Sequence, residues 1–346
     1  MVRGACNPKF FFVLRQSVVL FMSSSLFLNC WFLTGPTASG KTSVATPLAN
    51  QINAEIVSLD SMAVYRGMDI GTAKPTEQDR QRVPHHLVDV MDPDQEFSIA
   101  EYLAAAESTV AGLHSRDKAV LFVGGTPLYL KALLRGMSTG PAPDWEFRQQ
   151  VKQELERHGQ ADLHKRLEQI DPLSASKIHP NDTKRIIRAL EVHKLTGQPI
   201  SHQQVEFEDG HQADDCRVFV LEWPRHVLHQ RIDERVQKFF ERGIVEEVRQ
   251  LLAKFGPLSR TAMQAVGYRE VVEYLEGLRN LEKTIELVKI RTHRFAKHQV
   301  TWFRSLSECR THAVDGQMNP TRVAEEIVQL GEASQENGRR LKLSGE

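Results

Sequence analysis

The sequence predicts an α/β protein built on a parallel sheet, and three observations lead to this fold class. Short apolar runs of β-type residues occur at 30–34, 55–59 and 119–123, and helical patterns separate them. A glycine or an aspartate follows each run. After residues 138–143, which are rich in Ser, Gly and Pro, the β-type runs stop and helical patterns take over. Since buried strands that alternate with helices form parallel sheets covered on both faces, we expect a sheet core with a helical insertion and C-terminal helices.

Helical patterns account for most of the remaining chain. They fall at 42–51, 99–113, 145–157, 161–169, 183–195, 225–240, 244–254, 268–275 and 281–303. Ser98 is placed to cap the second of these helices, because a serine side chain can accept a hydrogen bond from the free N–H groups of the first turn. One more strand is expected at 217–221, where the chain returns to the core after the insertion.

These patterns divide the chain into five parts. They are an extension at 1–29, a core in two pieces at 30–141 and 206–330, a helical insertion at 142–205 and a polar tail at 331–346. The extension contains an apolar run at 18–28, which three serines interrupt and which is shorter than the roughly 20 residues that span a bilayer. We therefore expect no membrane anchor, and interpret the extension as disordered or as the result of a start site placed too early.

The charge balance argues against a strongly basic protein that coats nucleic acids. The 346 residues include 44 Lys and Arg and 44 Asp and Glu, so the formal net charge is zero. A composition that is 41% hydrophobic and 25% charged is typical of a globular protein and excludes collagen-like or wholly disordered chains. The four cysteines show no Cys-x-x-Cys spacing, which argues against a zinc module or a disulfide framework. We expect a cytoplasmic monomer.

A phosphate-binding loop follows the first predicted strand. Residues 35–42 fit the pattern G-x-x-x-x-G-K-[ST] at every fixed position, between a strand and a helix. Backbone N–H groups and the start of the helix attract an anion, Lys41 adds a full positive charge, and the Thr42 hydroxyl can bind Mg²⁺. The expected nucleotide- or diphosphate-binding residues are Gly35, Pro36, Thr37, Ala38, Ser39, Gly40, Lys41 and Thr42. The core should therefore have a fold like that of the P-loop NTPases.

The loop does not by itself identify its ligand. ATP is the commonest ligand of such loops, but any diphosphate ester would make the same contacts. In a protein that hydrolyses ATP, an apolar strand usually ends in an aspartate that helps to hold Mg²⁺. Here Gly124 and Gly125 follow the third run, and the acidic residue, Asp60, follows the second. We expect the strand before Asp60 to lie beside the strand of the phosphate loop.

A series of sequence blocks, in order along the chain, resembles the tRNA dimethylallyltransferase (isopentenyltransferase) family of bacterial type. The longest block is DSMAVYRGMDIGTAKP, at 60–75. The others are PHHL at 84–87, GGTPLY at 124–129, HPND at 179–182, RALEV at 188–192, QAVGYR at 264–269 and AKHQVTWFR at 296–304. The phosphate loop alone would be weak evidence, but these blocks extend the resemblance from about residue 30 to residue 305.

The resemblance implies transfer of a dimethylallyl group from dimethylallyl diphosphate to N6 of adenosine 37, beside the anticodon of tRNA. It implies that the phosphate loop holds the diphosphate of this donor, with Mg²⁺ on Thr42. Asp60 resembles the general base of the family, since a carboxylate can accept the proton of a weakly nucleophilic amine. Thr126 matches a threonine near the reacting centre, and Arg235 matches an arginine that binds the diphosphate. These three residues are the catalytic candidates.

The resemblance also implies which residues bind the anticodon stem-loop. They are Ser61, Met62, Ala63, Arg148, Lys184, Arg185, Arg188, Gln264, Gly267, Arg269, Lys297, His298, Gln299, Trp302 and Arg304. The charge pattern fits this expectation, because residues 286–310 carry six Lys or Arg against two Glu, with aromatic residues among them. Two positions depart from the family pattern. Ala63 replaces a common Gln, and His298 replaces the usual Arg, so base recognition and phosphate contact are both in question there.

Two other functions fit the same phosphate loop. One is a small-molecule kinase, in which Asp60 would activate a hydroxyl group. Residues 142–205 contain 10 Lys and Arg and 9 Asp and Glu, which does not exclude the arginine-rich lid of a kinase. The other is a non-catalytic RNA-binding protein that a nucleotide switches.

Overall fold

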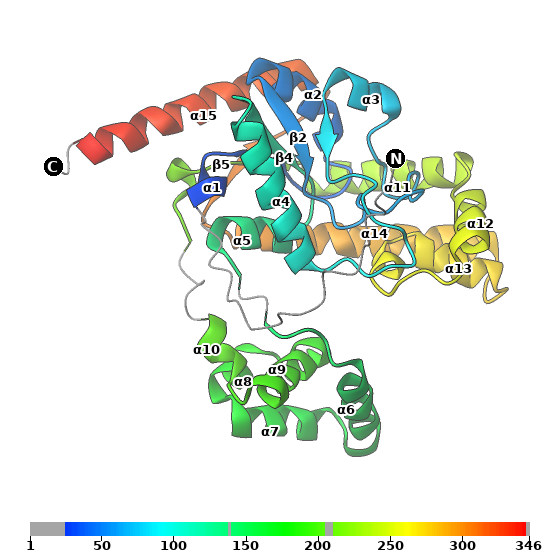
Figure 1. The fold of residues 1–346 in the computed structure, drawn as a ribbon. Coiled ribbons are helices and arrows are strands. Elements are labelled where there is room, and N and C mark those ends of the chain that lie inside the picture. Colours follow the sequence, from blue (N-terminus) through cyan, green and yellow to red (C-terminus); the bar gives the residue numbers. More distant parts are fainter. Residues whose placement is uncertain (1–24, 138–139, 205–209, 344–346) are drawn as a thin grey trace, which may run out of the picture. The chain divides into compact units, whose positions relative to one another are not determined.

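The computed structural model describes residues 25–137, 140–204 and 210–343 (Figure 1). The expected extension at 1–29 therefore falls largely outside the described residues. The chain divides into two compact units. The larger unit is formed by residues 23–136 together with 209–346, and the smaller unit contains residues 137–208.

A six-stranded parallel sheet forms the centre of the larger unit. Its strands are β1 (Trp31–Thr34), β2 (Ala54–Ser58), β3 (His85–His86), β4 (Ala119–Val123), β5 (Arg217–Glu222) and β6 (Cys309–Ala313). They lie in the order β3-β2-β4-β1-β5-β6, and each neighbouring pair is parallel. The expected α/β class is confirmed.

The expectation that β1 and β2 lie side by side in the sheet is wrong. β4 lies between these two strands and pairs with both, so that Leu121 is in register with Trp31 on one side and Ile56 on the other. The physical reason is burial: β4 is apolar at all five positions and occupies the centre of the sheet, where both faces are covered. Asp60 still follows a strand at the carboxyl edge of the sheet, but the glycines after β4 separate it from the phosphate loop.

The two faces of the sheet alternate along each strand, as the period of two requires. Leu33, Ile56 and Leu121 face one apolar core, to which α2, α11 and α15 also contribute. Phe32 and Phe122 belong to the other face, where their rings stack with centroids 4.9 Å apart. The sheet is thus buried on both faces, and this packing holds the ends of its strands in place.

The larger unit also contains helices, which pack on this sheet or on one another (Figure 1). They are α1 (Ser25–Leu28), α2 (Lys41–Gln51), α3 (Glu77–Arg82), α4 (Ile99–His114), α5 (Pro127–Arg135), α11 (Arg225–Glu241), α12 (Ile244–Phe255), α13 (Tyr268–Leu275), α14 (Leu281–Arg304) and α15 (Pro320–Leu343), with short 3-10 turns at Ala213–Asp215 and Ala262–Gln264. The expected cap is confirmed, because Ser98 accepts a hydrogen bond from the Glu101 N–H at the start of α4. Among the described residues, no helix is both long and apolar enough to cross a bilayer.

The smaller unit is helical in its described residues. Its helices are α6 (Trp145–His158), α7 (Gln160–Ile170), α8 (Pro172–Lys177), α9 (Thr183–Thr196) and α10 (Ile200–Gln204). It has an apolar core of its own, in which Phe147 and Val151 of α6 pack with Leu163 and Leu167 of α7 and Ile186 of α9. Asp144 and Asp182 accept backbone N–H groups at the starts of α6 and α9, which fixes where these helices begin.

Candidate active site

A pocket of about 600 Å³ lies at the carboxyl edge of the sheet, within the larger unit. The phosphate loop and the segments that follow β2 and β4 form part of its wall, and side chains from α11 and α14 complete it. Polar and charged lining residues include Lys41, Thr42, Asp60, Lys74, Arg231, Arg235 and Gln299. In open parallel sheets the carboxyl edge is where ligands bind.

The phosphate loop joins β1 to α2 and has the shape that its glycines permit. Gly40 has a φ of 89° and precedes Lys41, the first residue of α2. A side chain on Gly35 would bring its Cβ within 2.8 Å of the Leu221 carbonyl oxygen, which leaves room only for glycine. Residues 37–43, which include the first turn of α2, line the pocket, and the start of a helix attracts an anion.

Lys41 provides the positive charge of the loop. Its Nζ donates to the carbonyl oxygens of Gly35 and Pro36 at 2.9 and 2.8 Å. Burial and, to a smaller extent, the charge of Arg235 lower the pKa of Lys41 to about 7, although Asp60 opposes them. An anionic ligand in the pocket would favour the protonated form.

Asp60 and Thr126 lie in two segments that a hydrogen bond joins. Asp60 Oδ1 accepts the Met62 N–H at 2.8 Å, and the neighbouring Ser61 N–H donates to Thr126 Oγ1 at 3.1 Å. Asp60 lines the pocket, and the Thr126 hydroxyl orients the segment beside it. The segments that follow β2 and β4 are in close contact here. A Cβ on Gly124 would lie only 2.1 Å from the backbone oxygen of Leu59, so no side chain fits between them.

Two arginines one turn apart on α11 face the pocket. Arg235, the expected diphosphate ligand, lies over the ring of Phe239, and burial lowers its pKa while Asp60 raises it. Arg231 was not among the expected site residues. Its Nε donates to the Ala38 carbonyl at 2.9 Å, so α11 is bonded directly to the phosphate loop. The signal in the sequence was the i,i+4 spacing of the two arginines, which places them on one face of a helix.

Gln299 of α14 forms a hydrogen bond to the phosphate loop, whereas the resemblance places it among the tRNA-binding residues. Its side-chain oxygen accepts the Thr37 N–H at 2.8 Å and its amide donates to the Gly125 carbonyl at 2.5 Å. The residue is 3% exposed. The amide of Gln299 therefore joins α14 to the loops after β1 and β4, and both of its polar atoms have partners within the protein.

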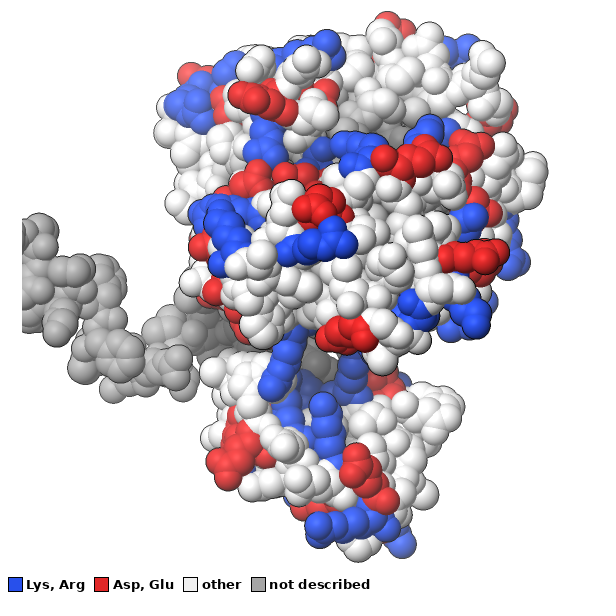
Figure 2. All heavy atoms as spheres, turned by 90° about the vertical axis from the view of Figure 1, so that its right-hand side faces the viewer, with Lys and Arg blue, Asp and Glu red and all other residues white. Residues whose placement is uncertain are grey.

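The other expected tRNA-binding residues of the larger unit differ in exposure. Lys297, His298 and Arg304 of α14 are exposed, as are Gln264 and Arg269, whereas Ser61, Met62 and Trp302 are half-buried and Ala63 and Gly267 are buried. Some of the cations are engaged by carboxylates: Arg304 pairs with Glu222, and Arg269 with Glu273. Figure 2 shows Lys and Arg intermixed with Asp and Glu over the face of the larger unit that it draws.

The smaller unit holds the four remaining candidates. Lys184 and Arg185 are exposed near the start of α9. Arg148 and Arg188 instead bind the carboxylate of Glu191, which is 0% exposed, at 2.7 and 2.5 Å. Burial raises the pKa of Glu191, but the hydrogen bonds from both arginines outweigh burial and bring it below the usual range. Both arginines therefore stabilise the unit itself.

Comparison with known proteins identifies the family of this chain. The profile of the IPP transferase family matches residues 63–306. A tRNA dimethylallyltransferase of Rhodopirellula baltica is 50% identical over 82% of this chain and 88% of its own, and one of Symbiobacterium thermophilum is 46% identical over 86% and 93%.

Solved structures give the same result. The crystal structure of a tRNA isopentenylpyrophosphate transferase from Bacillus halodurans superimposes with a TM-score of 0.65 at 35% identity, over 90% of this chain and 99% of that one. A eukaryotic dimethylallyltransferase crystallised while acting on tRNA gives a TM-score of 0.66 at 27% identity, over 82% of this chain and 73% of that one. This protein therefore belongs to the tRNA dimethylallyltransferase family.

Proposed function

We propose that the protein transfers a dimethylallyl group from dimethylallyl diphosphate to N6 of adenosine 37 in tRNA. The observation that carries this proposal is the joint presence, in one pocket, of an anion-binding loop and the carboxylate of Asp60, which follows β2. A donor diphosphate needs the first and an amine acceptor needs the second. Family membership supports tRNA as the acceptor, and the anion-binding loop supports a diphosphate as the donor.

The donor is held by cations and backbone N–H groups. The start of α2 and Lys41 bind the diphosphate, and Arg235 approaches it from α11. As the bond between C1 of the dimethylallyl group and the diphosphate oxygen breaks, the electron pair leaves with the oxygen. These positive groups stabilise the negative charge that develops there, at positions that the fold has already fixed.

The acceptor is activated by Asp60. The exocyclic amine of adenine is a weak nucleophile, because its lone pair is delocalised into the ring. As the new bond between N6 and C1 forms, a proton of the amine passes to the Asp60 carboxylate. The hydrogen bond from the Met62 N–H holds one carboxylate oxygen, Oδ1, in place for this transfer.

The pocket also fits Mg²⁺. The hydroxyl of Thr42 lies in the pocket at the start of α2, where it can supply one ligand, and Mg²⁺ commonly takes its remaining ligands from phosphate and water. Among the described residues, no cluster of three or more His, Cys, Asp or Glu side chains suits a metal held by the protein alone. When bound with the diphosphate, Mg²⁺ would neutralise part of its charge.

The tRNA is bound by exposed polar and charged side chains, some of them in each unit. Lys297, His298 and Arg304 on α14, Gln264 and Arg269 near α13, and Lys184 and Arg185 on α9 are the residues best placed for this role. Adenosine 37 must leave the stack of the anticodon loop to reach Asp60, as in other enzymes that modify bases.

Transfer of label tests the proposal. The full chain is incubated with radiolabelled dimethylallyl diphosphate, unmodified tRNA and Mg²⁺, and the tRNA is then digested to nucleosides. We expect label in N6-dimethylallyladenosine from position 37. Phosphorylation of a small molecule with ATP would support a kinase instead, and tRNA binding without transfer would support a non-catalytic RNA-binding protein.

A further inference from the structure

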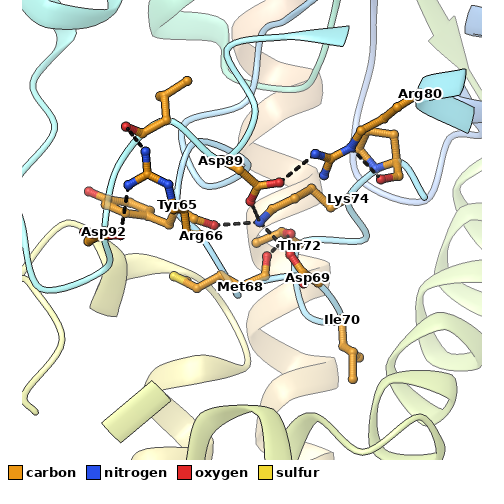
Figure 3. Close-up of polar contacts among 12 residues, drawn as sticks. Tyr65, Arg66, Met68, Asp69, Ile70, Thr72, Lys74, Arg80, Asp89 and Asp92 are labelled. Carbon is orange, nitrogen blue, oxygen red and sulfur yellow. Dashed lines mark hydrogen bonds and ion pairs between the residues drawn. The ribbon is translucent and has the colours of Figure 1, made fainter. Parts of the chain in front are cut away.

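A buried lysine lies in the segment that follows Asp60. The side chain of Lys74 is 2% exposed, and Figure 3 shows its ammonium pointing toward three oxygen atoms. Nζ lies 2.6 Å from Asp69 Oδ1, 2.5 Å from Asp89 Oδ1 and 2.6 Å from the backbone oxygen of Tyr65. A lysine ammonium has three N–H donors, so every donor has its acceptor.

The charges around Lys74 are balanced. Arg80 Nη1 lies 2.7 Å from Asp89 Oδ2, so two cations face the carboxylates of Asp69 and Asp89 (Figure 3). Burial raises the pKa of Asp89, but the hydrogen bonds from Lys74 and Arg80 outweigh burial and lower it. The Asp89 carboxylate is thus ionised at neutral pH. Lys74 is the buried member of this network, because the side chains of Asp69, Asp89 and Arg80 are 58%, 28% and 33% exposed. Removing its ammonium leaves the partly buried Asp89 with one cation fewer, which is costly.

A short series of hydrogen bonds connects Lys74 to Asp60. The Asp60 carboxylate accepts the Met62 N–H, and the Met62 carbonyl accepts the Tyr65 N–H at 3.2 Å. The Tyr65 carbonyl in turn accepts from the Lys74 ammonium. Residues 60–65 therefore form a compact turn that is held at its far end by the buried lysine.

Lys74 also fastens a second segment to this turn. The N–H groups of Asp89 and Val90 donate to the carbonyl oxygens of Ala63 and Val64 at 3.2 and 2.8 Å. Asp89 holds an unusual backbone conformation, with a φ of 57°, and its side chain is the one that Lys74 binds. The ammonium thus joins the two segments that carry the pocket residues Ala63 and Val88.

We propose that Lys74 is a positioning residue, which fixes Asp60 and its turn so that the carboxylate meets the acceptor amine. This inference rests on the proposed function. All three acceptors of the ammonium lie within residues 65–89, and none belongs to the phosphate loop. Loss of Lys74 should therefore affect the acceptor side of the reaction and leave donor binding intact.

The substitution Lys74→Met tests this split in the full-length protein. It keeps a long side chain and removes the ammonium. We expect the single-turnover rate of prenyl transfer at saturating substrates to fall by roughly ten- to a hundredfold, as for a misplaced catalytic group. The KM for dimethylallyl diphosphate should change by less than about twofold, because ground-state donor contacts remain.

Asp92→Asn is the matched control. Asp92 pairs with Arg66 at 2.9 Å between the same two segments, but these side chains are 38% and 50% exposed. Exposed pairs contribute little, so the rate should stay within about twofold of the unaltered protein. Comparable losses in Asp92→Asn and Lys74→Met would overturn the role given to the buried ammonium.

Two further results would overturn the inference. One is a normal rate in Lys74→Met. The other is a loss of rate and donor affinity in equal measure that follows a lower melting temperature, which would indicate general unfolding. If Lys74→Met does not fold, Asp89→Asn removes one charged partner, and it too must lower the rate at constant donor KM. Transfer by the unaltered protein on the same tRNA separates failure of this inference from failure of the proposed function.

Discussion

The side chain of Gln299 bonds to the backbone of Thr37, 262 positions earlier in the chain, and thereby fixes the phosphate loop from α14. The same amide donates to Gly125, so one buried side chain spans the loops after two strands. This contact explains how a C-terminal helix contributes to a site whose motif lies near the start of the chain.

Substitution Gln299→Met should weaken donor binding. It keeps the length of the side chain and leaves the Thr37 N–H and the Gly125 carbonyl without their buried partner. Loss of such hydrogen bonds should raise the KM for dimethylallyl diphosphate by about tenfold. Steady-state kinetics at saturating tRNA measures the change. Thr301→Ala alters an exposed position on the same helix and should leave the KM as it was; an equal shift in both variants would contradict the assigned contact.

Asp60→Asn should strongly lower the rate of prenyl transfer and leave tRNA binding unchanged. An amide cannot accept the proton of the attacking amine, so the single-turnover rate should fall by at least about a hundredfold. Filter binding should show unchanged affinity for tRNA, because the substitution keeps the size of the side chain. A variant that transfers label at a near-normal rate would show that another group removes the proton.

Donor binding should depend on pH through Lys41. Burial lowers the pKa of Lys41 to about 7, so its ammonium is fully present only well below pH 7 and is lost as the pH rises through that value. A diphosphate binds the ammonium, and the donor dissociation constant should therefore increase above pH 7, by at most about tenfold per pH unit.

Lys41→Arg provides the comparison, because a guanidinium stays charged throughout this range. Titration calorimetry from pH 6.5 to pH 9 measures both proteins. Ionisation of the donor diphosphate affects binding to both proteins equally, so a difference between them reports on residue 41. An identical pH dependence in Lys41→Arg would rule out Lys41 as its origin.

Glu191→Gln should destabilise the smaller unit. The carboxylate is fully buried between Arg148 and Arg188, so its loss leaves two cations without their counter-charge. We expect the free energy of unfolding to fall by about 3 kcal/mol. Denaturant unfolding, with proteolysis to locate the change, measures the effect. Glu154→Gln removes an exposed pair with Arg166 and should cost about 0–1 kcal/mol; equal losses would show that burial is not decisive.

The contribution of Glu191 to stability should also vary with pH. Because its folded-state pKa is lowered, the stabilisation is present above the ordinary pKa of glutamate and is lost as the pH falls through the lower folded-state value. In Glu191→Gln this part of the pH dependence should be absent.

The central strands could be predicted from the sequence, and the edge strands could not. β1, β2, β4 and β5 begin and end within two residues of the expected runs, because burial on both faces requires continuous apolar sequence. β3 is two histidines long, and β6 (CRTHA) is partly exposed at the edge of the sheet, so neither contains an apolar run.

Some of the site residues could likewise be predicted from the sequence, and others could not. The phosphate loop could be identified because its function depends on local backbone shape, which glycines encode. The roles of Gln299, Arg231 and Arg148 depend on partners far away in the sequence, and no local pattern distinguishes a cation that faces solvent from one that binds a buried glutamate. The lateral order of the strands is another long-range property, and for that reason the position of β4 was missed.

The place of the smaller unit along the chain affects how the protein is made. β1 pairs with β4 on one side and with β5 on the other, and β5 begins only at Arg217, after the whole of residues 137–208. On the ribosome, the nascent sheet therefore keeps an open edge at β1 while the helical unit is translated and folds. Since an open strand edge can pair with other chains, the nascent protein is exposed to aggregation and to capture by chaperones during this interval.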